Sequence, residues 1–529
     1  MLNTQIHHLN ETLNQKLLNL YNQNKFVELI NLAEDHIKNK IFNAETYNLM
    51  GMASYNLQKF DYSILNFKRS IKLKPDYAEA FNYIGYPLKS IGKLDLAIEN
   101  HIQAIKFKPD YIEAFINLAL CYVDQKKFDQ ALKVFYRAKK LAPNFYDLHL
   151  NIASVLIEKE KYDKALKLFK KLLDKNPNDT RILNNLGSIY KAKGNFKKSL
   201  IFYKKAIKQD SNNMLSRWNL SYCSLYKFDF KNGWMNYNLR WKMKNKTPPE
   251  YKLDKPVWDG FSIGTVLIYP EQGIGDQILF SRCINYFQNK KNKFIFSTEK
   301  KLMTLFKSSF PKIKVVEHTE NIKSDFCIGL GDLPKFCIKD IKSLNDLSKP
   351  YLFPMNSFNQ NKINVLKRNL LCGLSWNSVN GDVGKNKSIS LEQLKDIISL
   401  PKINFIDLQY SDTQDEINHF SKKYNINILT NQKIDNFNDM NALALQIQEC
   451  DFIITISNST AHLSGGLGKK TFLMAPKGKG KYWYWSQKKN MCLWYPSVEV
   501  FQQKKRGVWD EVIEEIKSRI IQSYITNNI

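Results

Sequence analysis

Two short loops in the second half of the chain carry residue types that could do chemistry. The first is the segment EQGIGDQILFSR at 271–282, which directly follows the apolar run TVLIYP. Gly273 and Gly275 allow a tight turn from strand to helix and a close approach of the backbone to a ligand. Asp276 then begins a helix and faces the expected cleft. The structural alternative is a plain turn whose aspartate only caps the helix.

The second loop lies in TISNSTAHLSGGLGKKTFLMAP at 455–476. A buried strand is expected to end at Ser457, and a helix to begin near Ala461 and stop at Gly465–Gly468. The residues between supply capping oxygens and exposed N–H groups: Asn458, Ser459 and Thr460. A helix N-terminus beyond a strand end is a ready diphosphate site. His462, in the first turn, could bond the phosphates or a ribose, or could simply cap or pack.

The elements that position these loops are short apolar runs alternating with amphipathic stretches, which is typical of buried parallel strands and helices. The expected strands are TVLIYP (265–270), KFIFST (293–298), IKVVE (313–317), DFCIGL (325–330), LCGLSW (371–376), NFIDLQ (404–409), DFIITIS (451–457) and KTFLMAP (470–476). The two series predict two doubly wound, Rossmann-like domains, with ligands bound beyond the strand C-termini in the cleft between them.

The first half repeats with a period of 34 residues. Prolines stand at 75, 109, 143 and 177, and columns of small and of bulky residues keep the same spacing. Proline ends the second helix of each pair because it lacks the N–H, and a small residue lets two antiparallel helices cross closely. The pattern resembles the tetratricopeptide repeat. The expected repeats are 44–77, 78–111, 112–145, 146–179, 180–213 and a degenerate one at 214–247, after a weaker capping repeat at 10–43.

One column of the repeats is asparagine. It consists of Asn117, Asn151, Asn185 and Asn219, one in the first helix of each of four repeats. The O-linked N-acetylglucosamine transferases look similar, with an inward asparagine ladder that grips the backbone of an acceptor peptide. An amide both donates and accepts, so a ladder can read an extended chain. Asparagine is also abundant throughout this chain, which is the alternative explanation.

Bulk properties narrow the classes further. The 529 residues suggest about three compact units, and 43% hydrophobic content excludes a mainly disordered chain. No apolar run reaches the length of a membrane span and the polar N-terminus lacks a signal core, so a cytoplasmic location is expected. Eight scattered cysteines form no C-x-x-C pair and are expected to be buried, reduced thiols. The net charge of +29 rests mainly on lysines spread over helix faces, which argues against a nucleic-acid partner.

Taken together, the motifs WDG, EQGIGD, GLSW, KSISL, SNSTAHLSGGLGK and WYPSV resemble the glycosyltransferase domain found behind tetratricopeptide repeats in many bacteria. That domain is similar to the ADP-heptose lipopolysaccharide heptosyltransferases and thus resembles glycosyltransferase family 9. The resemblance covers most of 234–503. It implies a GT-B fold and an inverting, metal-independent sugar transfer with a nucleotide-sugar as co-substrate and no other cofactor. The absence of a D-x-D motif at a strand end is consistent with this.

The resemblance also assigns roles. Asp276 matches the presumed general base, which takes the proton of the attacking hydroxyl, and Glu271 is a second candidate. The leaving diphosphate needs N–H donors or cations, which the loop Ser457–His462 and either Lys385 or Lys387 of GKNKSIS would provide. The heptosyltransferases have Asp–Thr–Gly before the histidine, where this chain has Ser–Asn–Ser, so an ADP-heptose donor is not carried over.

The sequence thus predicts a multidomain chain, an all-α solenoid followed by an α/β GT-B part. The expected divisions are a helical cap (1–43), the repeats (44–247), an acceptor-side domain (248–365), a nucleotide-sugar domain (366–503) and a C-terminal helix (504–529). The favoured function is glycosyl transfer to a protein or glycan acceptor recruited by the repeats, with peripheral membrane contact possible. The alternative is a non-catalytic scaffold with a degenerate transferase domain. The aromatic stretch 482–496 could stack on a base or sugar, or could pack as core.

Overall fold

The computed structural model describes most of the chain in two compact units, residues 1–193 and 194–529. The described residues are 2–242, 255–271, 273–318, 322–355, 369–379, 381–431, 434–478, 480, 482–488 and 490–525. The predicted linker at 244–256 lies outside these residues except for its last two positions. The predicted boundary at 365/366 lies outside them too.

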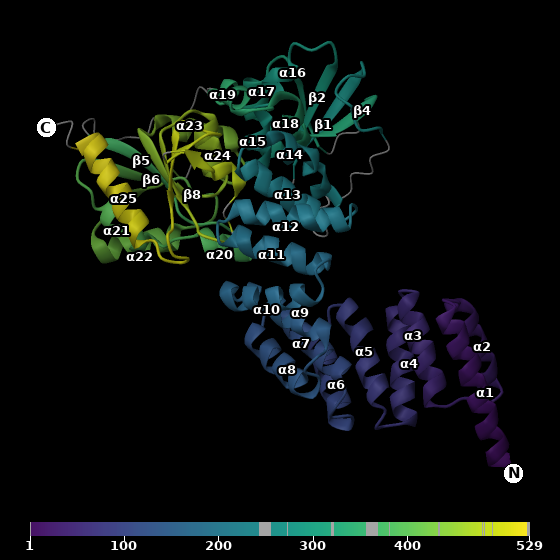
Figure 1. The fold of residues 1–529 in the computed structure, drawn as a ribbon. Helices are drawn as coiled ribbons and strands as arrows, with labels where there is room; N and C mark the ends of the chain where they lie inside the picture. The colour runs from purple at the N-terminus through teal and green to yellow at the C-terminus, as the bar shows by residue number, and fades with distance from the viewer. Residues whose placement is uncertain are drawn as a thin grey trace. The chain divides into compact units, whose positions relative to one another are not determined.

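Unit 1 is made of helices only (Figure 1). They are α1 (Leu2–Asn22), α2 (Phe26–Lys38), α3 (Ala44–Asn56), α4 (Phe60–Leu73), α5 (Ala78–Ser90), α6 (Leu94–Phe107), α7 (Ile112–Asp124), α8 (Phe128–Leu141), α9 (Tyr146–Glu158), α10 (Tyr162–Lys175) and α11 (Thr180–Ala192). From α3 onward, corresponding helices begin 34 residues apart, as the repeat period predicts. The capping repeat is a helix pair, α1 and α2, although its first helix begins before residue 10.

Small residues let the two helices of a repeat approach closely. A Cβ atom on Gly51 would lie 2.7 Å from the ring of Phe67, and one on Gly85 would lie 2.4 Å from the ring of His101. The bulky column therefore packs first against the small column of its own repeat. Phe67 also lies near Tyr83 of the next repeat, with ring centroids 6.5 Å apart, so the same column contacts the neighbouring repeat as well.

Unit 2 begins with four further helical segments: α12 (Phe196–Gln209), α13 (Met214–Tyr226), α14 (Phe230–Met235) and the 3₁₀ helix η1 (Tyr237–Lys242). The last of these are built into the α/β core. Phe230, Trp234 and Tyr237 belong to the same buried hydrophobic cluster as the strands that follow. The indole N–H of Trp234 donates to the carbonyl of Ile338 at 2.9 Å. The division between units at 193/194 therefore differs from the predicted one at 247/248, because the sixth repeat packs on the sheets.

The first sheet has four parallel strands in the order β3-β2-β1-β4. The strands are β1 (Thr265–Tyr269), β2 (Lys293–Thr298), β3 (Lys314–Glu317) and β4 (Phe326–Gly329). The intervening segments are α15 (Ile274–Ser281), α16 (Ile284–Phe287), η2 (Lys300–Leu302), α17 (Met303–Ser309), η3 (Leu330–Asp332), α18 (Pro334–Cys337) and α19 (Ile341–Asp346). Each strand lies where the sequence predicted one.

The second sheet has the order β10-β11-β12-β9-β8-β5-β6-β7. Its strands are β5 (Leu370–Ser375), β6 (Ile403–Asp407), β7 (Ile428–Leu429), β8 (Phe452–Ile456), β9 (Thr471–Ala475), β10 (Gln487–Lys488), β11 (Met491–Cys492) and β12 (Val498–Gln502). The four predicted strands pair in parallel at its centre. The sequence interpretation missed the short β7, the antiparallel β10 and β11, and β12.

Helices cover both faces of the second sheet (Figure 1). These helices are α20 (Gly381–Lys387), α21 (Leu391–Ile398), α22 (Gln414–Tyr424), α23 (Met440–Glu449), α24 (Ser459–Gly466) and α25 (Asp510–Ile520). Along β8, Phe452 and Ile454 join the core under α21, α22 and α25, whereas Ile453 joins the core under α23 and α24. This alternation defines an α/β region with parallel sheets. The predicted C-terminal helix is α25, followed by a π-helical turn at Ile521–Ile525.

Candidate functional site

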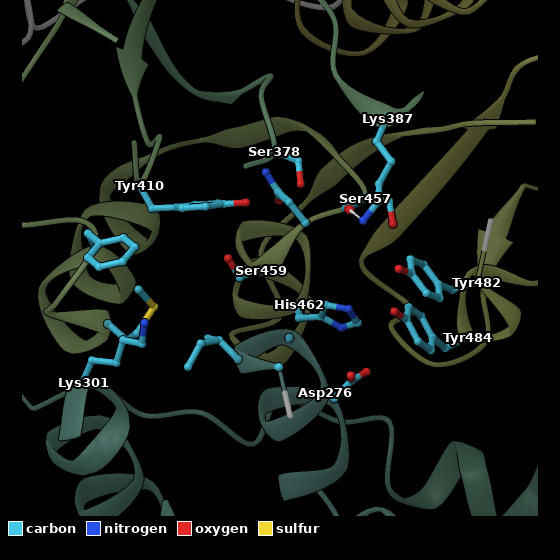
Figure 2. A pocket seen from close by; sticks show the side chains of 16 residues that line it. Asp276, Lys301, Ser378, Lys387, Tyr410, Ser457, Ser459, His462, Tyr482 and Tyr484 are labelled. Atoms are coloured by element: carbon cyan, nitrogen blue, oxygen red, sulfur yellow. Dashed lines mark hydrogen bonds between the residues drawn. The ribbon is translucent and has the colours of Figure 1, made fainter. Parts of the chain in front are cut away.

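A cavity of about 240 Å³ lies at the carboxyl ends of the central strands in unit 2 (Figure 2). Its lining comes from the segments that follow β1, β2, β5, β6, β7 and β8, together with the aromatic stretch after β9. The lining residues are Gly273, Ile274, Gly275, Asp276, Lys301, Ser378, Lys387, Tyr410, Phe437, Met440, Ser457, Asn458, Ser459, His462, Tyr482 and Tyr484. The two predicted loops therefore meet in one cavity.

Strand order explains why these loops meet. In the first sheet, β1 lies between β2 and β4, so the chain reverses its direction of travel across the sheet beside β1. In the second sheet the reversal lies between β5 and β8. Loops diverge at such switch points and leave a crevice outside the carboxyl ends of the strands. The cavity occupies that crevice in both sheets at once.

The loop after β1 places Asp276 in the first turn of α15, which begins at Ile274 rather than at the aspartate. Gly273 has the N-cap position without a side-chain cap, and Gly275 lies against α24. A Cβ atom on Gly275 would lie 2.8 Å from Cδ2 of His462. This glycine is therefore required by the close approach of two helices from different sheets.

The loop after β8 leads into α24, which begins at Ser459, two residues earlier than predicted. Asn458 is the N-cap, and its side-chain oxygen accepts the N–H of Ala461 at 3.3 Å. Its amide donates to the hydroxyl of Ser375 at 2.7 Å, which ties the cap to the end of β5. Thr460 is fully buried and also points to Ser375, so it does not line the cavity.

Of the two candidate lysines, only Lys387 reaches the cavity; Lys385 is exposed on α20 and does not line it. The ammonium group of Lys387 donates to the carbonyl of Ser457 at 3.0 Å and lies 4.9 Å from the ring centroid of Tyr482. Burial lowers the pKa of Lys387 to about 8, while the nearby carboxylate of Asp276 acts in the opposite direction. The side chain is thus a buried cation held close to its titration point.

His462 is enclosed by aromatic rings. Its Nδ1 shares a hydrogen bond of 3.0 Å with the hydroxyl of Tyr495, and its ring centroid lies 4.7 Å from that of Trp485. Burial lowers the pKa of His462 to about 3, and the positive charges of Arg282 and Lys387 add to the effect. The imidazole is therefore neutral at physiological pH, and it can offer a hydrogen bond but no charge.

Glu271 lies outside the cavity. Its carboxylate accepts from the guanidinium of Arg240 at 2.6 Å and from the N–H of Gly331 at 2.7 Å. Arg240 also donates to Asp332 at 2.7 Å, and all three side chains are buried. Both oxygens of the Glu271 carboxylate accept from Arg240, and one also accepts from the Gly331 N–H, so the geometry gives Glu271 a structural role rather than that of a base.

Ser457, which directly follows β8, is almost fully buried at the cavity wall. Its hydroxyl accepts the indole N–H of Trp485 at 2.8 Å. The serine is therefore engaged with the aromatic stretch, and its carbonyl is engaged with Lys387.

The sequence interpretation left out one end of the cavity. Tyr410 and Lys301 lie there, away from Asp276, as Figure 2 shows. Ser378, Phe437 and Met440 also line the cavity and were not predicted. These residues follow strand ends or lie beside helix starts, and no local motif marks them.

Residues of the aromatic stretch 482–496 divide between the two predicted roles, contact with a ligand and packing in the core. Tyr482 and Tyr484 stack 5.1 Å apart on the cavity wall, whereas Trp483 and Trp494 are buried core. Neighbouring residues in a loop can face opposite ways, so composition alone could not separate these roles.

The predicted asparagine column lies on the first helices of successive repeats. Asn117, Asn151 and Asn185 in unit 1 are half-buried, whereas Asn219 in unit 2 is buried. The amide of Asn117 donates to Asn82 at 3.0 Å and to the hydroxyl of Tyr86 at 2.9 Å. Asn117 is therefore part of an internal polar network in this state of the chain.

Comparison with known proteins identifies the repeats. Residues 112–145 and 150–213 match family models described as tetratricopeptide repeat, so the chain contains such repeats. Protein FlbA of Caulobacter vibrioides is 23% identical over 322 residues, covering 54% of this chain and 52% of FlbA. The chain thus spans about half the length of the curated relative that it matches.

Two solved structures of tetratricopeptide-repeat proteins are similar to the chain. TTC0263 of Thermus thermophilus is 24% identical, with 34% of this chain and 99% of that chain covered and a TM-score of 0.30. A repeat protein of Parabacteroides merdae is 13% identical, with 44% and 91% covered and a TM-score of 0.39. Within the described part of the chain, no helix is long and apolar enough to cross a membrane.

Proposed function

We propose that unit 2 is a glycosyltransferase of GT-B organisation, which moves a sugar from a nucleotide-sugar to a protein or glycan acceptor. One observation carries the proposal. The cavity sets the carboxylate of Asp276, from the first sheet, beside the buried ammonium of Lys387 and the N-terminus of α24, from the second sheet. A base on one wall and anion-binding groups on the other are what transfer from a diphosphate donor requires.

The α24 side supports binding of the donor diphosphate. The first N–H groups of a helix have no partner within the helix and carry the positive end of its dipole. Lys387 adds a charge, and a bound diphosphate would raise its pKa and keep it protonated. His462 adds a neutral hydrogen-bonding group in the first turn of the same helix. These groups stabilise the negative charge that develops on the leaving diphosphate.

The Asp276 side supports proton removal. The acceptor hydroxyl gives its proton to the carboxylate of Asp276 while its oxygen forms the new bond to the anomeric carbon. The bond from that carbon to the diphosphate oxygen breaks, and the diphosphate leaves with the electron pair. Attack from the face opposite the leaving group inverts the anomeric centre, as the heptosyltransferase resemblance implies. Every charge in this step is met by a described side chain or by a helix end, so metal-independent transfer is proposed.

The repeats support recruitment of the acceptor. Stacked repeats form extended surfaces that bind other proteins. We therefore assign partner binding to the tetratricopeptide repeats, with the asparagine column as one candidate contact. This assignment holds whether the acceptor is the bound protein itself or a glycan that it carries.

The test measures donor binding and transfer separately. Melting temperature of the full chain is recorded against nucleotide-sugars and free nucleoside diphosphates, because a ligand of the folded state raises it by mass action. Lys387→Ala should abolish the shift, and Lys385→Ala, on the same helix but outside the cavity, is the matched control. Asp276→Asn should keep the shift and lower transfer by roughly a hundredfold or more.

One observation favours the scaffold alternative. The position of the family's donor-contacting aspartate is Ser457, and its hydroxyl is held by Trp485. In that case the repeats alone would carry the function. Absence of any shift across the nucleotide panel, with the protein folded and Asp276→Asn indistinguishable from wild type, would support this alternative and contradict glycosyl transfer.

A further inference from the structure

A loop at the amino-terminal edge of the first sheet displays apolar side chains to solvent. The apolar tip, defined as Val257, Phe261 and Ile263, lies in the residues that lead into β1. Phe261 is 86% exposed and Ile263 72%, the highest values for large hydrophobic side chains in the described chain; Val257 is 58% exposed. Apolar groups gathered in this way on a protein surface mark an interaction site.

The loop is held in shape by a network centred on Asp259. Its carboxylate accepts the N–H of Phe261 at 2.7 Å, the N–H of Ser262 at 2.8 Å and the hydroxyl of Ser262 at 2.7 Å. Hydrogen bonds from the Ser262 and Phe261 backbone lower the pKa of Asp259 to about 2, so the turn persists at any ordinary pH. Phe261 is thus presented on a preorganised turn.

Buried aromatic residues anchor the same loop. Trp258 is buried, and its indole N–H donates to the carbonyl of Ser262 at 2.9 Å. Gly260 has a φ of +99°, and a Cβ atom there would lie 2.3 Å from the ring of Phe336. One aromatic side chain of the loop therefore points into the core while Phe261 points out. Poor packing does not explain the exposure of Phe261.

Lysines border the tip on one side. The turn before β2 and the first residue of β2 carry three exposed lysines, Lys290, Lys291 and Lys293. The turn is fixed to the loop because the amide of Asn292 donates to the carbonyl of Ser262 at 2.7 Å. The backbone of this turn is therefore held next to the loop that carries Phe261 and Ile263.

Lysines also line a groove next to the loop. Phe336, beneath Gly260, lines a neighbouring groove of about 550 Å³. The floor of that groove includes Trp234 and Ile338, and its rim carries Lys231, Lys335 and Lys339. Exposed lysines thus accompany the apolar tip on the segment around the start of β2 and at the neighbouring groove.

We propose that the apolar tip and these lysines dock the protein on an anionic phospholipid surface. Exposed aromatic and aliphatic side chains insert at the boundary of headgroups and acyl chains, and each lysine nearby gains from the negative surface potential. A protein partner would need a complementary apolar pocket with an acidic rim; a bilayer supplies both features over any area. The apolar tip lies at the amino ends of the strands, at the opposite end of the first sheet from the cavity, so docking leaves the cavity accessible.

The test is sedimentation of the full chain with vesicles of phosphatidylcholine containing 30% phosphatidylglycerol, and with vesicles of phosphatidylcholine alone. Wild type should pellet with the anionic vesicles, with binding at least about tenfold weaker on the neutral ones. Phe261→Ser with Ile263→Ser should weaken binding about tenfold or more, because both apolar groups that would insert into the bilayer are lost. Lys290→Glu with Lys291→Glu and Lys293→Glu should weaken it about a hundredfold.

Matched controls separate the tip from general charge and apolarity. Leu141→Ser, at an exposed apolar site of unit 1, and Lys170→Glu with Lys171→Glu, on exposed positions of α10, should leave vesicle binding within about twofold. Circular dichroism confirms that each variant is folded. Failure of wild type to pellet at low ionic strength, or equal weakening by the tip and control variants, would overturn the proposal and leave the tip to a protein partner.

Discussion

Both units use the same packing device, a glycine against a ring, but over very different distances along the chain. In the repeats, Gly51 meets Phe67 and Gly85 meets His101, each within one helix pair. In the α/β part, Gly275 meets His462 on a helix from the other sheet. A local glycine lets a repeat close on itself, whereas a long-range glycine joins two sheets and shapes a cavity. Glycine thus serves stability in unit 1 and helps to shape the cavity in unit 2.

The largest expected effect is a loss of stability in unit 2 that unit 1 does not share. Arg240→Ala leaves the carboxylates of Glu271 and Asp332 buried without their cation, which should cost about 3–5 kcal/mol. All nine tryptophans lie at position 218 or later, so tryptophan fluorescence in urea reports unit 2 alone. The control is Arg181→Ala, whose guanidinium is itself exposed, so its ion pairs should contribute less than about 1 kcal/mol. Loss of the helical signal of unit 1 together with the fluorescence transition would mean that the units do not unfold separately.

The glycine comparison itself can be tested with two matched variants. Gly275→Ala and Gly51→Ala each place a Cβ atom within 3 Å of a ring, and each should cost about 1–3 kcal/mol. Only Gly275→Ala should also weaken nucleotide binding, because it displaces His462 in the cavity wall. Calorimetric titration with a nucleoside diphosphate gives the affinity. Equal affinities for the two variants would show that the α15–α24 contact does not shape the site.

Titration of Lys387 gives the next effect. Since burial lowers its pKa to about 8, its charge is present below that pH and is lost above it. Diphosphate affinity should therefore be constant from pH 6 to 7 and fall about tenfold per unit above pH 8. The neutral His462, with a pKa of about 3, should add no dependence between pH 5 and 7. An affinity that falls between pH 5 and 7 would instead assign a charged role to the histidine.

Stability should respond to the same group with a definite sign. The unfolded chain keeps the Lys387 proton up to about pH 10, whereas the folded chain releases it near pH 8. Unfolding therefore takes up a proton between these values, and the stability of unit 2 gains from this group as pH rises through that window. In Lys387→Met this contribution should be missing from fluorescence-monitored urea unfolding at pH 7.5 and 9.5.

The smallest effect at neutral pH is expected in the repeats. His101 stands in a column otherwise filled by Phe and Tyr, and burial lowers its pKa to about 4. In the unfolded chain this histidine takes up a proton near pH 6.5. The contribution of His101 to the stability of unit 1 is therefore lost as pH falls from there toward 4. His101→Phe should change stability by at most about 1 kcal/mol at pH 7 and remove that loss. Helical signal in urea at pH 7 and 5 measures both, and an unchanged loss would place its origin elsewhere.

From α3 onward the repeat period predicted where each repeat of unit 1 begins, because each contact is local. Prolines, small residues and rings all recur at fixed spacing, and the long strands of unit 2 are likewise marked by their own apolar runs. The two-residue strand β7 and the antiparallel β10 and β11 are too short to leave such a signal. Unit 2 begins before the predicted end of the repeats, and Trp234 in its helical part finds its partners far along the chain, where no local pattern records them.

The cavity was predictable only where glycine and helix-start residues marked it. Asp276, Lys387 and the α24 cap residues line it as expected, and each belongs to a motif that follows a strand. Glu271 belongs to the same motif as Asp276 but does not line the cavity. Its carboxylate is held by Arg240, a partner that lies outside the motif. Tyr410 and Phe437 line the cavity through topology alone, since the order of strands brings their loops together.

The placement of Trp234 has a consequence for synthesis on the ribosome. The residue leaves the ribosome well before its contacts Ile338, Trp483 and Trp494. At about 5–20 residues per second, roughly 15–50 seconds pass between translation of Trp234 and of Trp494. During that interval the repeats of unit 1 can already fold, while α14 holds its aromatic face uncovered. The nascent chain therefore passes through a stage in which the repeats of unit 1 are folded and the aromatic face of α14 is still exposed to solvent. That stage is where a chaperone would bind.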